Sequence, residues 1–457
     1  MKEVSTYAEE VSKMQGGRAT PDTLSSDNPQ TLLLHAPMSH FQIMGVAVVA
    51  FLCALDGFDV LAITFVAPAL AQQWGIGRAQ IGLLLSIGLL GMAGGSLLIA
   101  PAADVIGRRA LVFLSLVTMI IGTSWTALAG DLSQMMWSRV LTGIGVGTMI
   151  SVINPLAAEY ANARRRYLTL SVINIGYPAG GFLGGLISAY LLTHFNWRAV
   201  FFFATGLSVV LLTLVWKWLP DPISFHIARP KPDALARVND YLSKCGIRAV
   251  SALPMRPEGA EKTRFINLFG GDMRWVTLKV TCMYTLYLVT LFFMQSWVPS
   301  LVVNQGFTQA QGTVVSAMIM FGGIIGGLSI GLAATRFGLK SILVPALFIA
   351  AVMTALFGLV AAKFGLLLIV AVIVGFFLSG SMIGLYSVIW QSFPAHVRAS
   401  GTGFSVGIGR IGAAISPLVA GLLYSLDFTR AGVSLLMALP AVLAALVLWS
   451  LPITDRT

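Results

Sequence analysis

The heptapeptide DVIGRRA, residues 104–110, returns in altered form as TRFGLKS at residues 335–341. Both copies follow a long apolar run, and their glycines, Gly107 and Gly338, are separated by 231 positions. Two further pairs of basic residues keep nearly the same spacing, at 232 and 233 positions: Arg198 with Arg430, and Arg165 with Arg398. Three landmarks at almost one offset predict that the chain is a duplication of one structural unit.

The apolar runs around these landmarks predict the fold class. Of the 457 residues, 57% are hydrophobic and only 10% are charged, with a mean hydropathy of +0.85, whereas soluble proteins carry about 25% charged residues. A membrane-spanning helix needs about 20 apolar residues. We therefore predict twelve spans, at about 41–71, 79–102, 109–129, 132–159, 166–193, 198–219, 275–303, 310–335, 340–362, 365–392, 398–425 and 430–451.

The expected organisation is an all-α membrane protein of two six-helix bundles, at residues 40–219 and 275–452. A polar loop at residues 220–274 connects the bundles, and we expect a mostly flexible tail at residues 1–39 and a short one at residues 453–457. Units with an even number of helices form parallel repeats, and such repeats place a substrate site between the halves near the middle of the membrane.

The distribution of Lys and Arg predicts the orientation. The loops on one side hold seventeen of them, nine of which lie between residues 220 and 274, whereas the loops on the other side hold four. The positive-inside rule therefore places the basic loops and both tails in the cytoplasm. Because topology explains the net charge of +11, we expect a lipid bilayer as the partner and no nucleic acid.

Two carboxylates interrupt the first apolar run, in the stretch FLCALDGFDVLAITF at residues 51–65. Asp56 and Asp59 are three residues apart and so share one helix face, roughly 22–27 Å from the cytoplasmic end of the span. Burial disfavours a charged carboxylate, and a second one nearby disfavours it further. We predict that at least one of them carries a coupling proton, charged when open to water and neutral when occluded. The alternative is a carboxylate that bonds a neighbouring helix end and never titrates.

The chain also resembles a known family. Asp104, Gly107, Arg108 and Arg109 resemble the loop signature Gly-x-x-x-Asp-Arg-x-Gly-Arg-Lys/Arg of the major facilitator superfamily, although Ala100 and Val105 replace its first Gly and first Arg. The second copy matches at Gly331, Arg336, Gly338 and Lys340, with Thr335 in place of the acid, and RVLTGIGVG at 139–147 resembles the fourth span of that superfamily.

A narrower resemblance comes from LDGFD in the first span and GIGRIG at 407–412. Together they resemble the aromatic acid:proton symporter family, which imports benzoate, hydroxybenzoates, protocatechuate and related acids. The resemblance implies a proton-coupled symporter of aromatic carboxylic acids that works by alternating access in a bacterial inner membrane. The alternatives are a superfamily transporter for another organic anion, such as muconate or a non-aromatic acid, or for a sugar, and a sensor that does not transport.

Two arginines are predicted to lie deep in the membrane. Arg139 is about 10 Å from the outer end of the fourth span, and Arg410 about 18 Å from the inner end of the eleventh. An Arg fork can hold a carboxylate through two hydrogen bonds, so we expect Arg410 to bind the substrate and Arg139 to pair with the acids of the first span. The reverse assignment stays open, as does a structural role for Arg410 as a cap of helix carbonyls.

Aromatic side chains are expected to wall the ring of the substrate, although each is more often a packing residue. Tyr284 and Tyr287 lead these candidates because they are three residues apart on one face. The further candidates are Tyr177, Trp297, Phe321, Tyr386, Phe376 and Phe377, with Asn174, Gln295, Ser379 and Ser381 as partners of ring hydroxyls.

The loop signature predicts a gate rather than a binding site. Asp104 is expected to accept hydrogen bonds from a helix start in the other half, where the helix dipole favours an anion, and Arg108 to act with it. The gating set is completed by Gly107, Arg109, Glu159 and Arg336. The alternative is a simple loop salt bridge.

Several classes of function are not expected. No nucleophile–base pair or metal-ligand set is evident, so we predict no enzyme, no metal site and no cofactor beyond the proton gradient. Cys53, Cys245 and Cys282 have neither disulfide nor zinc spacing. GIGRIG is formally G-x-G-x-x-G, but it lies within a predicted span rather than after a strand. We expect a monomer.

Overall fold

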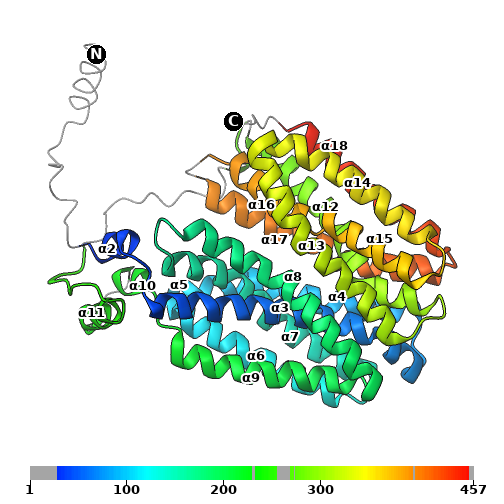
Figure 1. Cartoon of the computed structure of the whole chain (residues 1–457), viewed down its shortest axis with the longest axis horizontal. Helices are drawn as coiled ribbons and strands as arrows, with labels where there is room; N and C mark the ends of the chain where they lie inside the picture. The colour runs from blue at the N-terminus through cyan, green and yellow to red at the C-terminus, as the bar shows by residue number, and fades with distance from the viewer. Residues whose placement is uncertain (1–27, 229–231, 255–267, 272, 395–396, 452–457) are drawn as a thin grey trace, which may run out of the picture.

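The computed structural model describes residues 28–228, 232–254, 268–271, 273–394 and 397–451. Within these ranges the only regular secondary structure is helical, and there is no strand. The first half, blue to green in Figure 1, forms one bundle, and the second half, yellow to red, lies beside it. Both bundles run along the long axis of the molecule.

Twelve helical segments are long and apolar enough to cross a membrane, which confirms the predicted spans to within a few residues. The first half contains α3 (His40–Trp74), α4 (Arg78–Gly94), α6 (Arg108–Leu128), α7 (Leu132–Tyr160), α8 (Arg166–His194) and α9 (Arg198–Trp218). The second contains α12 (Met273–Val303), α13 (Gln309–Phe337), α14 (Leu339–Leu359), α15 (Phe364–Phe377) with α16 (Ser381–Ser392), α17 (Arg398–Ser425) and α18 (Arg430–Trp449).

The helices pack in the same pattern in both halves. In the first half α3 packs on α8, α4 on α7 and α6 on α9; in the second α12 packs on α17, α13 on α15 and α14 on α18. Two equivalent contacts join the halves, α4 with α17 and α8 with α13. This correspondence is what a duplicated six-helix unit related by a two-fold axis requires.

The glycines of the repeated heptapeptides adopt the same backbone conformation. Gly107 has φ +97° and ψ 150°, and Gly338 has φ +90° and ψ 145°. Each stands immediately before a helix, α6 or α14. Only glycine populates this region readily, which explains why both copies of the turn contain it.

The repeated arginines make the same contact as well. Arg198 Nη2 donates to the carbonyl oxygen of Ala129 at 3.0 Å, and Arg430 Nη2 donates to that of Val360 at 2.9 Å. Both acceptors terminate the third helix of their half. Each arginine therefore satisfies a helix-end carbonyl that has no partner within its own helix.

Two spans are less regular than predicted. After α4 the chain passes through a π turn (Gly95–Ile99), a 3₁₀ turn (Ala100–Ala102) and the short α5 (Ala103–Ile106); a proline such as Pro101 clashes with the carbonyl four residues earlier in a regular helix. The tenth span breaks between α15 and α16, where a Cβ on Gly380 would lie 2.8 Å from the Cα of Gly326. The break therefore allows the backbone at Gly380 to approach α13 at Gly326 closely.

The segments predicted as a tail and a loop contain packed helices, which corrects the expectation of flexibility from residue 28 onward. These are α2 (Pro29–His35), α10 (Ile223–Ala228) and α11 (Ala234–Lys244), which cluster at one end of the first bundle. Phe41 packs edge-on against Tyr241 with ring centres 5.9 Å apart, and Asn162 donates to the carbonyl oxygen of Ala36 at 2.9 Å. Residues 1–27 and the predicted tail at 453–457 lie outside the described residues.

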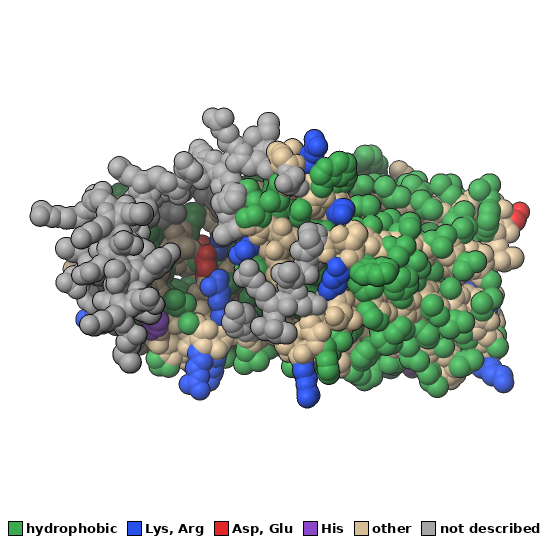
Figure 2. Space-filling view, turned by 90° about the horizontal axis from the view of Figure 1, so that it is seen from above, with side chains coloured by type: hydrophobic (Ala, Val, Ile, Leu, Met, Phe, Trp, Pro, Cys, Tyr) green, Lys and Arg blue, Asp and Glu red, His purple; other side chains and the backbone are tan. Residues whose placement is uncertain are grey.

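We call the end of the molecule that carries α2, α10 and α11 the terminal end, and the opposite end the distal end. Figure 2 shows a face on which hydrophobic side chains dominate, with most Lys and Arg nearer the terminal end. Large exposed tryptophans lie near both ends of the spans, at Trp216, Trp275, Trp390 and Trp449 on the terminal side and Trp125 and Trp137 on the distal side. Such belts mark membrane–water interfaces.

The two halves meet closely at the distal end. A Cβ on Gly82 of α4 would lie 2.7 Å from the carbonyl oxygen of Pro417 and 3.0 Å from the Cα of Gly421, both on α17. Beside this contact, Arg78 Nη1 donates to the carbonyl oxygen of Tyr424 at 3.2 Å. A large apolar core accordingly continues from the second half into the distal part of the first.

A substitution at the second glycine turn tests the strain argument. Gly338→Ala should lower the free energy of unfolding by about 1–3 kcal/mol, because the backbone conformation there disfavours a Cβ. Thermal unfolding in detergent measures the loss. Gly331→Ala, in a helix with open space around it, is the matched control and should be neutral or slightly stabilising; equal loss in both variants would contradict the argument.

Candidate functional site

The two acids of α3 lie in the interior of the first half. Asp56 and Asp59 are both 0% exposed, because α3 is covered by α7, α8 and α9 as well as by α12. Glycines allow the close approach of α8: a Cβ on Gly57 would overlap the carbonyl oxygen of Tyr177, and one on Gly180 would overlap that of Ala54. The carboxylates are therefore held between helices, away from water.

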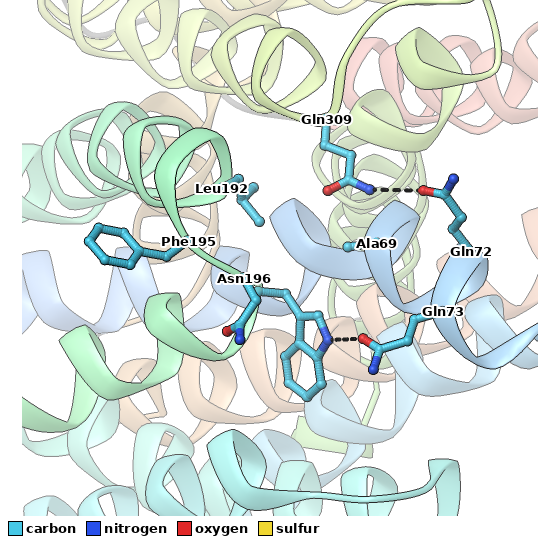
Figure 3. Close-up of a pocket in the computed structure, with 8 residues that line it drawn as sticks. Ala69, Gln72, Gln73, Leu192, Phe195, Asn196 and Gln309 are labelled. Atoms are coloured by element: carbon cyan, nitrogen blue, oxygen red, sulfur yellow. Dashed lines mark hydrogen bonds between the residues drawn. The ribbon is translucent and has the colours of Figure 1, made fainter.

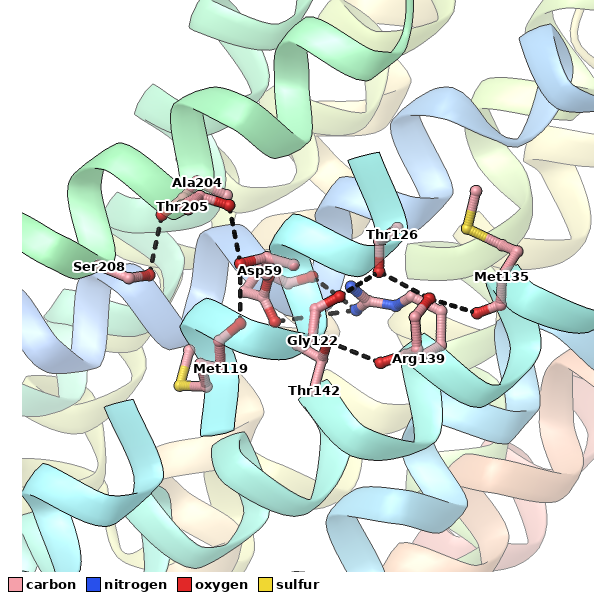
Figure 4. Close-up of polar contacts among 12 residues, drawn as sticks. Asp59, Met119, Gly122, Thr126, Met135, Arg139, Thr142, Ala204, Thr205 and Ser208 are labelled. Carbon is pink, nitrogen blue, oxygen red and sulfur yellow. Dashed lines mark hydrogen bonds and ion pairs between the residues drawn. The ribbon is translucent and has the colours of Figure 1, made fainter. Parts of the chain in front are cut away.

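Asp59 has a basic partner within the same half (Figure 4). Arg139 Nη2 lies 3.8 Å from Asp59 Oδ2 and donates to the backbone carbonyl oxygen of Asp59 at 3.1 Å. The Arg139 side chain is almost fully buried, and its guanidinium lies 5.9 Å from the centre of the Phe201 ring. The two charges thus compensate each other in a dry interior.

A small cavity of about 20 Å³ adjoins this ion pair, lined by Asp59, Arg139 and apolar residues of α3, α4 and α7. Among the described atoms, Asp59 Oδ1 and Arg139 Nε and Nη1 have no hydrogen-bond partner. A cavity of this size holds about one water molecule when two or more polar groups face it. The space therefore suits a water that completes the hydrogen bonding of the pair.

Asp56 differs from Asp59 because no ion pair or hydrogen bond reaches its carboxylate oxygens from the described residues. Two charged groups act on Asp56 electrostatically, the like charge of Asp59 one turn away and the opposite charge of Arg410 in the other half. An uncompensated charge at such a position costs several kcal/mol. The surroundings of Asp56 therefore favour a neutral carboxyl group. They favour a carboxylate only when no other anion binds Arg410.

Arg410 is placed by the glycines of its motif. A Cβ on Gly412 would lie 2.8 Å from the carbonyl oxygen of Thr285, and one on Gly409 would overlap the ring of Tyr284. These contacts press α17 against α12 and bring the half-buried Arg410 beside Tyr284. Arg410 Nη1 is buried and has no hydrogen-bond partner among the described atoms. The guanidinium can therefore still donate a hydrogen bond to a carboxylate.

Tyrosines gather around this arginine. The hydroxyl of Tyr284 donates to that of Tyr386 at 3.1 Å, and their ring centres are 5.7 Å apart. Tyr287 lies 6.2 Å from Tyr284 between ring centres and donates to the carbonyl oxygen of Leu378 at 2.9 Å, where the tenth span breaks. Tyr177, from the first half, is within electrostatic range of both Asp56 and Tyr386.

We call Asp56, Tyr177, Tyr284, Tyr386 and Arg410 the central cluster. It contains a carboxyl group and a tyrosine from the first half, and two tyrosines and an arginine from the second. Five of the residues that the sequence nominated therefore meet between the halves.

Other nominated residues lie elsewhere. Trp297 is at the distal end, where its indole donates to the carbonyl oxygen of Pro417 at 3.1 Å and its ring lies 5.0 Å from that of Tyr424. It lies more than three turns beyond Tyr284 along α12, so it packs at the contact between the halves rather than in the central cluster. Phe321 faces Phe182 across α8 and α13 at 5.3 Å between ring centres.

The polar candidates are also dispersed. Asn174 is exposed on α8, whereas Gln295 is buried on α12 with an Oε1 that has no partner among the described atoms. Ser381 donates to the carbonyl oxygen of Phe377, and Phe377 packs against Phe376. Ser379 is the residue that a Cβ on Gly323 would meet, so it belongs to the α13–α15 contact.

The gating candidates separate into two groups. Arg108 donates to Glu159, whose other carboxylate oxygen accepts from Ser224 at 2.8 Å, and Arg109 donates to the carbonyl oxygen of Trp216 at 2.7 Å. Arg336 is exposed and stacks at 5.6 Å on the neighbouring Phe337 ring. The side chain of Asp104 lies outside the described residues.

Sequence reasoning missed three features of these sites. Ser224 was not nominated, since a serine in a polar segment gives no signal of a partner in α7. The Arg78–Tyr424 contact was also missed, although an arginine at the start of a span could have suggested it. The third is a group of glutamines at the distal end, Gln72, Gln73 and Gln309.

The chain is similar over nearly its whole length to characterised transporters. It is 29% identical to a gallate transporter of Pseudomonas putida, over 90% of this chain and 92% of that one. It is also 29% identical to a 4-hydroxybenzoate transporter of Acinetobacter baylyi, over 93% and 94%, and 23% identical to the benzoate transport protein of the same organism, over 88% and 87%.

Solved transporter structures have the same fold as this chain. The xylose transporter XylE of Escherichia coli, in a partially occluded inward open conformation, superposes with a TM-score of 0.72 at 14% identity and covers 92% of this chain and 99% of that one. The Major Facilitator Superfamily profile matches residues 48–332 and 280–457. With matches across both six-helix halves, the chain belongs to the Major Facilitator Superfamily, a family of membrane transporters.

Proposed function

We propose that the chain imports aromatic carboxylic acids of the benzoate and hydroxybenzoate class together with protons across a bacterial inner membrane. The central cluster carries the proposal, because it combines one unpaired carboxyl group, one arginine with a free guanidinium nitrogen and several tyrosine rings between the two halves. The names of the relatives, which transport gallate, 4-hydroxybenzoate and benzoate, support the class of substrate.

Arg410 binds the carboxylate of the substrate in this proposal. A planar guanidinium offers two parallel N–H groups to a carboxylate. Tyr284 and Tyr386 then supply flat walls for the ring, and their hydroxyls can bond ring substituents. Tyr287 holds the broken tenth span in position through its bond to the carbonyl oxygen of Leu378.

The proton coupling follows from charge balance at Arg410. With the site empty, the guanidinium of Arg410 acts on Asp56 as an opposite charge. When a substrate carboxylate binds the guanidinium of Arg410, Asp56 becomes a second anion in the buried site. Protonation of the Asp56 carboxylate then restores neutrality. One proton thus accompanies one carboxylate. Asp59 keeps its charge because Arg139 stays beside it.

Alternating access supplies the movement. The terminal end, which carries the basic loops, is cytoplasmic in this proposal, so the distal end faces outward and is closed here by the Gly82 and Gly421 contact. Rocking of the halves separates this contact and exposes the central cluster to the outside. The Arg108–Glu159 pair and Asp104 belong to the closure of the cytoplasmic side.

Competition uptake tests the substrate class. In proteoliposomes with an inward proton gradient, excess benzoate or 4-hydroxybenzoate should reduce uptake of labelled 4-hydroxybenzoate to a small fraction, because these acids share the ring and carboxylate that the cluster recognises. An aliphatic carboxylate at the same concentration should leave uptake nearly unchanged. Stronger competition by muconate or another non-aromatic acid would favour the alternative that the chain carries such an anion.

Asp56→Asn tests the proton site. For one proton per carboxylate, a gradient of one pH unit sustains up to about tenfold accumulation, and this accumulation should disappear in the variant because an amide cannot release a proton. Exchange of labelled for unlabelled substrate should persist. Asp427→Asn, at a distal turn with φ 59° that asparagine tolerates, is the control and should accumulate normally. Full accumulation by Asp56→Asn refutes the coupling role.

Arg410→Lys tests the substrate carboxylate site. Lysine keeps the positive charge near Asp56 but loses the fork, so the KM should rise about ten- to a hundredfold. The accumulation ratio at saturating substrate should stay close to that of the unaltered protein. Arg410→Ala should abolish uptake. An unchanged KM in Arg410→Lys would place the carboxylate elsewhere.

A further inference from the structure

A second pocket lies at the distal end, about 24 Å along α3 from Asp56 (Figure 3). Its volume of about 280 Å³ is close to the lower end of the range of small-molecule sites, about 300–1,000 Å³. Three segments line it: the end of α3 with Ala69, Gln72 and Gln73, the end of α8 and the α8–α9 connection with Leu192, Phe195, Asn196 and Trp197, and the start of α13 with Gln309. None of these side chains is acidic.

Hydrogen bonds fix the orientation of one carboxamide in this pocket. The indole Nε1–H of Trp197 donates to Gln73 Oε1 at 2.6 Å. An indole N–H can only donate, so the oxygen of Gln73 must face Trp197, which is itself 3% exposed. The amino group of Gln73 is consequently the part that remains available to a ligand.

A second carboxamide is fixed in the same way. The backbone N–H of Arg198 donates to Asn196 Oδ1 at 3.0 Å. A backbone N–H also only donates, so Asn196 likewise keeps its amino group free. The pocket therefore presents two N–H₂ donors whose oxygens are already used, and an acceptor-only group such as a carboxylate is the natural partner.

The remaining wall is apolar. Its apolar lining residues include Leu192 of α8, the exposed Phe195 and Ala69 of α3. The guanidinium of Arg198 stacks on Trp197 at 4.4 Å from the ring centre, so a positive charge adjoins one of the lining residues. A flat apolar ring with one carboxylate matches this combination.

We propose that the distal pocket binds an aromatic carboxylate, at a site separate from the central cluster. The choice of ligand rests on the proposed function, whereas the preference for an anion rests on the amide orientations. The proposed orientation of the protein places this site on the outer face.

The distal pocket depends on contact between the halves. Gln309 of α13 donates to Gln72 of α3 at 3.4 Å, and these residues belong to different halves. The complete pocket exists only while the distal ends meet. A ligand that binds one conformation shifts the population toward it, so a carboxylate in the distal pocket favours the distal-closed state. External substrate in excess should therefore slow its own uptake.

Protection from alkylation tests binding directly. In a background in which Cys53, Cys245 and Cys282 are replaced by serine or alanine, Leu192→Cys places one thiol in the pocket. External 4-hydroxybenzoate should slow the reaction of this thiol with a membrane-impermeant maleimide on intact proteoliposomes oriented with the distal end outside.

Isosteric acids provide the critical variants. Gln73→Glu and Asn196→Asp keep the oxygens that accept from Trp197 and Arg198 but replace the free amino group by an anionic oxygen. Each should raise the half-protecting concentration at least about tenfold, and each should relieve the inhibition of uptake at high substrate. Gln134→Glu adds the same charge to another exposed glutamine, whose oxygen accepts from Gly130 at 3.1 Å, and should change neither quantity.

Arg410→Ala separates this site from the central cluster. Protection that persists in Arg410→Ala and is lost in Gln73→Glu supports the distal pocket, whether or not aromatic acids are transported. Protection that is lost in Arg410→Ala and retained in Gln73→Glu and Asn196→Asp overturns it. Uptake without any protection also contradicts the distal site but does not affect the proposed function. Protection without uptake contradicts the proposed function and not the distal site.

Discussion

A carboxylate enclosed by membrane helices persists as an anion only beside a positive charge, and this constraint separates two aspartates that lie one turn apart. Asp59 has Arg139 at 3.8 Å in its own half, so that pair moves as a unit whenever the halves rock. Asp56 feels the like charge of Asp59 and the opposite charge of Arg410, and Arg410 belongs to the other half. The charge balance of Asp56 therefore depends on the relative position of the halves and on what else occupies Arg410.

Glycine contacts create the geometry in which this dependence operates. Duplication gives both halves the same packing, α3 on α8 and α12 on α17, and in each case glycines bring the backbones together, Gly180 in the first half and Gly412 in the second. The side chains on this common frame differ. The acids project from the first half and the arginine and most tyrosines from the second, so the chemistry of the central cluster requires both bundles. A symmetric duplicate would lack the pairing of opposite charges across the interface.

Much of this arrangement was predictable because long apolar runs and isolated charges are strong local signals. The twelve helices, the glycine turns and the burial of Asp56 follow from such patterns. Position along a helix does not reveal which neighbour a side chain meets: Trp297 was one candidate for the wall around the substrate ring, and its indole bonds Pro417 at the distal end. The helices in the segment expected to be a loop, and the break in the tenth span, depend on contacts between residues far apart in sequence, which local patterns do not contain.

The distal pocket and the central cluster require opposite relative positions of the two halves. In the proposed transport cycle, external substrate reaches the central cluster only when the distal ends separate, whereas the distal pocket is complete only when Gln72 and Gln309 meet. The apparent affinity of a site falls with the fraction of molecules in its accessible conformation. A ligand in the distal pocket lowers that fraction for the central cluster, and by reciprocity substrate entering from outside expels a ligand from the distal pocket. The two proposed carboxylate sites, linked through one rigid-body movement, would thus be antagonistic even without direct contact between their ligands.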